Sequence, residues 1–225
     1  DIDGDVYLAK FDKNGNMQWE KTYGSVFLDR GLTLYSNSLN EYYFSGIANT
    51  SVTNTNCFVT KTDSLGNVIW NKVLSSPTDD CGCVTSLTST EQIVGVGCVD
   101  TTIMGNQMKY NLFFLMDTSG SLVWRTVYPL QEEHEIIFNI REFPGKGFIA
   151  VGRTFDETLQ WNTRTGIIVM VDYQGNIQWE RRYRFPKANS GGGFAPSEVW
   201  DVIFLGDGGM TLLGQSFGEN QDLWL

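Results

Sequence analysis

The stretch Asp172-Tyr-Gln-Gly175-Asn176-Ile-Gln-Trp179 is one of four copies of the same motif in this chain. In every copy three steps separate the Asp from the Gly, and four separate the Gly from the Trp. The tryptophans follow one another at intervals of 51, 54 and 55 residues, a regularity typical of proteins built from stacked repeats. The other copies are Asp12-Lys-Asn-Gly15-Asn16-Met-Gln-Trp19, Asp63-Ser-Leu-Gly66-Asn67-Val-Ile-Trp70 and Asp117-Thr-Ser-Gly120-Ser121-Leu-Val-Trp124.

A second recurring feature is an apolar segment that ends in glycine. The intervals from each motif tryptophan to this glycine are 27, 27, 28 and 35 residues, so the last unit carries an insertion, Asn189–Pro196. The segments are Tyr42-Tyr-Phe-Ser-Gly46, Val94-Gly-Val-Gly97, Ile149-Ala-Val-Gly152 and Thr211-Leu-Leu-Gly214.

Each unit predicts four strands joined by turns. In the Asp-x-x-Gly motif, the Asp can accept hydrogen bonds from the turn backbone, and the Gly can adopt a positive φ angle. The motif therefore predicts the hairpin between the third and fourth strands. In the unit that follows Trp19, the four strands are expected at 30–35, 41–48, 56–62 and 67–73.

The apolar pattern predicts how the units pack. The segments 112–116 and 166–171 are apolar throughout, as expected for strands buried on both faces. The strand after each Asp-x-x-Gly turn alternates, which predicts a half-exposed outer strand whose tryptophan packs on the next unit. The sequence therefore predicts an all-β chain, a β-propeller with four-stranded antiparallel blades. The residues assigned to this structural repeat are Asp12, Gly15, Trp19, Asp63, Gly66, Trp70, Asp117, Gly120, Trp124, Asp172, Gly175 and Trp179.

The segment from Asp5 to Gly24 resembles the repeat of large secreted Bacteroidetes propellers, many of which resemble cargo of the type IX secretion system. It is more distantly similar to the tryptophan-docking repeat of quinoprotein-type propellers, which has one more residue between Asp and Gly. The sialidase Asp-box has one fewer residue on each side of its Gly. The resemblance implies an exported propeller and says little about activity, because a fold does not define a function.

The repeat divides the chain into units at about 1–28, 29–79, 80–134, 135–197 and 198–225. The first and last units are incomplete, and both contain a third strand. We expect one propeller domain that is part of a larger propeller, with about four repeats seen. A four-bladed ring, closed by the N-terminal strands completing the last unit, is the alternative.

The net charge of −10 and the sequence pI near 4.5 argue against binding to nucleic acid. No apolar run approaches the roughly 20 residues that span a bilayer, so membrane insertion is not expected. No cofactor is expected. The missing metal set and the altered spacing of the repeat argue against a quinone-dependent dehydrogenase.

The four cysteines all lie between Cys57 and Cys98. The predicted hairpin brings residues 81–83 opposite 97–99, so a disulfide from Cys81 or Cys83 to Cys98 is expected, and Cys57 is available to the remaining thiol. Disulfides or buried thiols are favoured over zinc, because Cys-x-Cys lacks the usual spacing of a zinc knuckle.

The variable loops are expected at the end of the blades opposite the short turns. They are 48–55, 99–109, 154–165 and 186–196. Ligands bind to such loops because a rigid scaffold presents them. Trp161, Arg164, Lys187 and Phe194 are the candidate ligand-binding residues, suited to a glycan or a peptide. The alternative is that Trp161 covers the rim of the core.

The only histidine, His134, lies among Glu132, Glu133 and Glu135. These carboxylates suit glycosidase chemistry, but a solvated acidic loop is the simpler interpretation. No catalytic or metal site is therefore assigned.

We expect a non-catalytic propeller module of an exported protein, located outside the cell, on its surface or in the periplasm. It would act as a scaffold, an adhesin or a domain that binds protein or glycan, within a larger secretion or surface complex. The alternative is a glycoside hydrolase or lyase with carboxylates at the propeller mouth.

Overall fold

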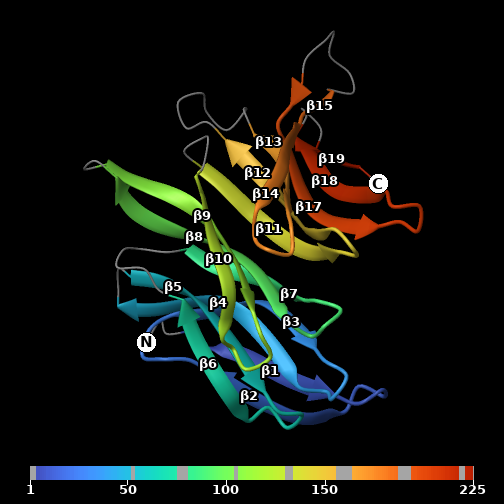
Figure 1. Cartoon of the computed structure of the whole chain (residues 1–225). Helices are drawn as coiled ribbons and strands as arrows, with labels where there is room; N and C mark the ends of the chain where they lie inside the picture. The colour runs from blue at the N-terminus through green and yellow to red at the C-terminus, as the bar shows by residue number, and fades with distance from the viewer. Residues whose placement is uncertain are drawn as a thin grey trace.

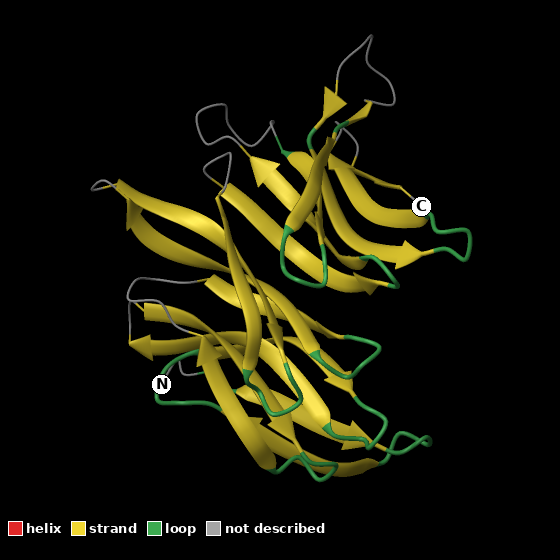
Figure 2. Cartoon of the chain, in the orientation of Figure 1, coloured by secondary structure: helices red, strands yellow, loops and turns green. Residues whose placement is uncertain are grey.

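The computed structural model describes residues 4–51, 54–74, 81–103, 106–129, 134–155, 164–186, 194–217 and 221–224. All regular secondary structure in these ranges is β-strand, and every strand pairs antiparallel with its neighbours (Figures 1 and 2). The expectation of an all-β chain is confirmed.

Three sheets have four strands each, paired in chain order. The first contains β3 (Asp29–Ser36), β4 (Tyr42–Ser51), β5 (Asn54–Thr62) and β6 (Val68–Leu74). The second contains β7 (Cys81–Leu87), β8 (Ile93–Ile103), β9 (Asn106–Met116) and β10 (Leu122–Pro129). The third contains β11 (His134–Phe143), β12 (Gly147–Phe155), β13 (Thr165–Val171) and β14 (Ile177–Tyr183).

Smaller sheets flank these three. A two-stranded sheet of β1 (Val6–Phe11) and β2 (Met17–Tyr23) precedes them, and a three-stranded sheet of β17 (Ser197–Phe204), β18 (Met210–Phe217) and β19 (Gln221–Trp224) follows. A short ribbon pairs β15 (Phe185–Pro186) with β16 (Phe194–Ala195).

The sheets stack face to face in chain order (Figure 1). The first strands of successive sheets contact one another, β3 with β7, β7 with β11, and β11 with β17. The fourth strands therefore form the opposite edges of the sheets. The array is open, with β1 and β2 at one end and β17 to β19 at the other (Figure 1).

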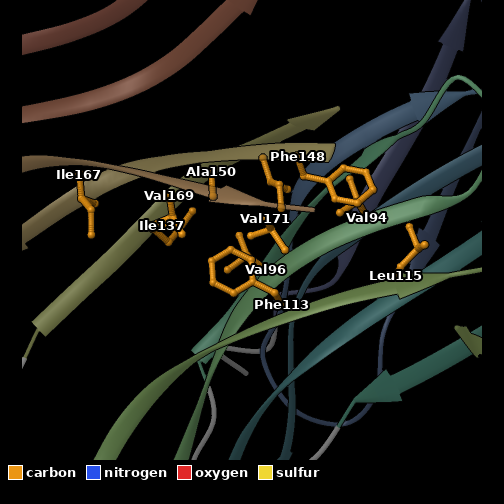
Figure 3. Packing of buried hydrophobic residues seen from close by; sticks show 11 residues of the cluster. Val94, Val96, Phe113, Leu115, Ile137, Phe148, Ala150, Ile167, Val169 and Val171 are labelled. Carbon is orange, nitrogen blue, oxygen red and sulfur yellow. The ribbon is translucent and has the colours of Figure 1, made fainter. Parts of the chain in front are cut away.

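The core lies between the sheets. Figure 3 shows one layer of it, in which Val94, Val96 and Phe113 of the second sheet meet Ile137, Phe148 and Val169 of the third. Every side chain of 112–116 is at most 6% exposed, and every residue of β13 is buried. The prediction that these strands are buried on both faces is confirmed. Each side chain of this size contributes roughly 1.5–3 kcal/mol on burial.

The Asp-x-x-Gly turns adopt the predicted geometry. Gly15, Gly66, Gly120 and Gly175 have φ between 79° and 87°. The Asp63 Oδ1 atom accepts from the backbone N–H groups of Leu65 and Asn67, both at 2.8 Å. These turns are capped by their own carboxylates, which satisfies backbone donors that a tight turn leaves without a partner.

The motif tryptophan explains why the same motif recurs in every unit. The Trp124 indole N–H donates to the Tyr173 carbonyl at 2.9 Å, and the equivalent Trp70 N–H donates to the Thr118 carbonyl at 3.2 Å. Each indole also covers the glycine of the next unit's turn. A Cβ atom on Gly175 would lie 2.8 Å from Trp124 Cδ2, and one on Gly120 would lie 3.0 Å from Trp70 Cδ2. The prediction that the tryptophan packs on the next unit is confirmed for these pairs. The turn requires glycine for two reasons, because the φ angle is positive and because a side chain would collide with the indole.

A second contact between sheets was not predicted. The Ser38 hydroxyl donates to Glu91 at 2.6 Å, and the Ser89 hydroxyl donates to Glu142 at 3.1 Å. Both pairs are 53 residues apart and join the hairpin turn of one sheet to the turn of the next or, for Glu142, to the end of the strand before that turn. Neighbouring units are thus linked at their turns as well as through their cores.

The Cys57–Cys83 disulfide joins β5 to β7 and so crosses from the first four-stranded sheet to the second. Of the two candidates expected for Cys98, Cys83 is therefore excluded because it is bonded to Cys57, the cysteine expected to take the remaining thiol. Cys98 is itself disulfide-bonded, and its Cα stands opposite that of Cys81 in the strand pairing.

Two of the expected variable loops are largely strand. Pairing of β4 with β5 continues to Ser51 and Asn54, and pairing of β8 with β9 continues to Ile103 and Asn106. The expectation of loops at 48–55 and 99–109 is corrected. These segments are rich in Thr and contain no proline, so the backbone ladder extends almost to the tip.

Candidate functional site

A buried charge cluster lies where the third sheet meets β17. The Glu198 side chain is 1% exposed, and its Oε1 atom accepts from Nη1 of Arg153 and, at 2.7 Å, from Nη1 of Arg164. The two arginine side chains are 18% and 13% exposed. Two guanidinium groups thus share one carboxylate oxygen. A charge held at low solvent exposure acts on its surroundings more strongly than a surface charge does.

Aromatic rings connect this cluster to solvent. The Arg153 guanidinium lies over the Phe138 ring, 5.5 Å from its centroid. Phe138 stacks on Trp200 with centroids 4.2 Å apart and planes 13° apart. The Trp200 side chain remains 42% exposed. The indole therefore presents an aromatic face that is supported by Phe138 and lies near the Arg153–Glu198–Arg164 cluster.

Trp200 and Phe138 also line a cavity of about 390 Å³ on the side of the array where the first strands meet. A volume of this size lies within the range of small-molecule sites, and such sites combine apolar walls with a few polar groups. Strands from four successive sheets contribute to the lining: Leu32, Ile47, Gly82, Val84, Val96, Gly97, Asn111, Ile136, Ile137, Phe138 and Trp200. We call this the inner groove.

The structure describes two of the four candidate ligand-binding residues. Arg164 belongs to the buried cluster, and its carbonyl accepts from the Ser197 N–H at 2.9 Å. Phe194 pairs with Pro186 in the short ribbon, so the chain near Phe194 approaches the chain near Arg164. Trp161 and Lys187 lie outside the described residues. The grouping of these four side chains stays a prediction.

The acidic segment considered for catalysis is only partly described. His134 and Glu135 begin β11, opposite Phe155 and Thr154. Glu132 and Glu133 lie outside the described residues. Within the described ranges, no three His, Cys, Asp or Glu side chains gather as a metal site would require.

A second polar cluster joins the inner strands near the short turns. Arg141 donates to both carboxylate oxygens of Asp201, at 2.8 and 3.0 Å, and the Asn139 amide donates to the same carboxylate at 2.8 Å. Both side chains of the ion pair are more than a third exposed. Solvent screens such a pair, so it ties β11 to β17 with only a small gain in stability.

Sequence reasoning missed Glu198, Arg153, Phe138 and Trp200. Glu198 is 45 residues from Arg153 and 34 from Arg164, and each side chain comes from a different strand or connection. One signal was available: Glu198 occupies a strand position next to Val199 and is followed by a tryptophan that belongs to no copy of the motif.

Comparison with known proteins adds no identity. No protein-family model matches the chain, and no curated protein matches it. Across the described ranges, no helix has the length and apolar character needed to cross a bilayer.

Proposed function

We propose that this chain is a β-propeller module that forms part of a larger propeller. The observation that carries the proposal is the hydrogen bond from a motif tryptophan to the turn of the next sheet, which Trp70 and Trp124 both form. In both cases the contact runs from one sheet to the next along the chain, and one such contact per unit is what a radial stack of blades requires. The order of the strands, first strand inside and fourth outside, fits the same architecture.

The function that fits this module best is non-catalytic binding or scaffolding in an exported or surface protein. The residues that recur in each unit are all explained by turn formation and packing between sheets. Disulfides such as Cys57–Cys83 persist in oxidising compartments, which favours a location outside the cytoplasm. The resemblance of the repeat to secreted Bacteroidetes propellers favours the same location.

The inner groove is the preferred binding site within this proposal. It has apolar walls and an exposed indole, and its lining residue Phe138 lies beneath the Arg153 guanidinium of the buried ion-pair cluster. An indole face provides a large rigid contact area with little loss of conformational entropy. These features favour a glycan or a peptide side chain with a flat apolar face over a phosphate-rich polymer.

The test is titration of the 225-residue chain with a panel of defined oligosaccharides and acidic and neutral peptides, followed by calorimetry. Trp200→Ala should weaken binding at least tenfold, and Leu39→Ala, which removes a 70% exposed side chain from a hairpin turn, should leave it unchanged. Equal affinities for both variants would contradict the groove, and Trp161→Ala would then test the outer loops in the same way. If the chain binds no member of the panel, the binding role is refuted. If it cleaves any of the oligosaccharides or peptides, the non-catalytic role is refuted.

A further inference from the structure

A second cavity, of about 160 Å³, lies between the first and second four-stranded sheets and reaches their fourth strands, β6 and β10. Each of the two sheets has four strands, so both walls are whole units of the repeat. An apolar cavity of about 150 Å³ is large enough to bind benzene. We call this cavity the outer cleft. The described residues that line it are apolar except for one arginine: Val73, Leu74, Val99, Leu112, Phe114, Leu122 and Arg125.

At the next junction, between the second and third sheets, a tyrosine links two equivalent positions. Tyr128 packs against the core cluster of that junction, and its hydroxyl donates to Glu180. Counted from the motif tryptophan of each unit, Leu74 corresponds to Tyr128. By the same count, Arg125 corresponds to Glu180. The outer cleft therefore lacks the ring and the hydroxyl group that link these two positions one unit further on. The other two units carry tyrosine at the position of Leu74, as Tyr23 and Tyr183.

Arg125 differs from its equivalents in its partners as well as in its charge. In every other unit the residue that follows the motif tryptophan accepts a hydrogen bond. These bonds run to Glu20 from Tyr7, to Asn71 from Thr60 and to Glu180 from Tyr128. Among the residues that the structure describes, none forms a hydrogen bond or an ion pair with Arg125. The Arg125 side chain is exposed, so its guanidinium group is accessible to a ligand from solution.

We infer that the outer cleft binds a small aromatic monocarboxylate. The ring of the ligand lies among the apolar walls beside Leu74, where the other units carry a tyrosine ring. Its carboxylate binds Arg125, because the planar guanidinium group matches a carboxylate with two parallel hydrogen bonds. A neutral aromatic molecule leaves the arginine without a partner, and a carboxylate without a ring leaves the apolar walls unfilled. The inner groove lies at the first strands, so this inference does not depend on what binds there.

The test is titration of the 225-residue chain with phenylacetate, followed by the amide signals of Leu74 and Arg125 in nuclear magnetic resonance spectra. Phenylacetate should bind saturably at one site, and phenylacetamide and acetate should each bind at least tenfold more weakly. Arg125→Gln should weaken the binding of phenylacetate at least tenfold. Arg181→Gln, which removes an exposed arginine from the fourth strand of the next sheet, should leave it unchanged.

A second variant tests the place of the ring. Leu74→Phe puts an aromatic side chain into the outer cleft and should abolish the binding of phenylacetate, while Trp200→Ala in the inner groove should leave it intact. A circular dichroism melt shows whether Leu74→Phe folds as the unmodified chain does, and Arg125→Gln, at an exposed position, decides the matter if it does not.

Three results would overturn the inference. One is the absence of saturable shifts with phenylacetate. Another is equal affinity for phenylacetate and phenylacetamide, or unchanged affinity in Arg125→Gln, since the arginine would then have no part in recognition. The third is binding that persists in a folded Leu74→Phe or is lost in Trp200→Ala, which would place the ligand outside the outer cleft.

Discussion

Alanine at Gly175 and at Gly15 should have different costs, although the two glycines have nearly the same backbone. Their φ angles are 87° and 84°, so an L side chain pays the same conformational penalty, about 1–2 kcal/mol, at either position. At Gly15 the new methyl group meets nothing within 4 Å. At Gly175 it meets Trp124 Cδ2 and Cε3 at 2.8 Å and Thr126 Oγ1 at 3.0 Å, and overpacking of this kind costs about 1–3 kcal/mol more.

The assay is urea unfolding at pH 7, followed by fluorescence and circular dichroism. Gly175→Ala should be about 2 kcal/mol less stable than Gly15→Ala, which corresponds to a Tm difference of about 4–8 °C in a chain of this size. Replacing Trp124 by Ala first should remove most of that difference, because the methyl group then has space. Equal destabilisation by the two alanines, or a difference that persists without the indole, would refute the role given to the tryptophan.

Three further predictions concern the charges and the disulfide. Glu198→Gln should destabilise the chain by about 3–5 kcal/mol in urea unfolding, because two largely buried guanidinium groups then face a neutral amide. Asp201→Asn, at the half-exposed ion pair with Arg141, should cost about 1 kcal/mol or less. Similar costs for the two variants would contradict the argument from burial. Cys57→Ser removes the disulfide that closes a loop of 26 residues, and the loss of this constraint on the unfolded chain should cost about 3.5 kcal/mol of stability. In the unmodified chain, alkylation without reductant should leave Cys57, Cys83 and Cys98 unlabelled. The Asn67 side chain and the turn N–H groups lower the pKa of the Asp63 carboxyl. The stability that this carboxylate contributes is therefore present above its ordinary pKa of about 3.9 and is lost as the pH falls through the lower pKa of the folded state. Between pH 5 and pH 2, the urea midpoint of Asp63→Asn should change less than that of the unmodified chain.

The sequence predicts local geometry well in this chain because each unit repeats the same solution. The turn at Asp63–Gly66 can be read from a single copy, since the carboxylate, the glycine and the spacing each have a local reason. The forward packing of Trp124 can be inferred from the alternation of its strand. The burial of 112–116 follows from an apolar run too short for a helix and flanked by turns.

What escaped prediction depends on contacts between units. The choice of Cys83 over Cys81 as the partner of Cys57 is set by how β5 and β7 stack, and no spacing within one hairpin decides it. The Arg153–Glu198–Arg164 cluster forms because β17 delivers a carboxylate beside β12, after an insertion that interrupts the repeat. In the arms of the β4–β5 and β8–β9 hairpins, polar residues such as Thr101 and Asn106 give the sequence the composition of a loop, although their backbone pairs as strand.

The contact of the Trp124 indole with the Gly175 turn is measured most directly by proton nuclear Overhauser effects. Cross-peaks are expected from the Trp124 indole protons to the Gly175 Hα protons, and from the Trp70 indole protons to those of Gly120. An indole of Trp124 or Trp70 that shows cross-peaks only within its own sheet would contradict the stacking on which the propeller proposal is built.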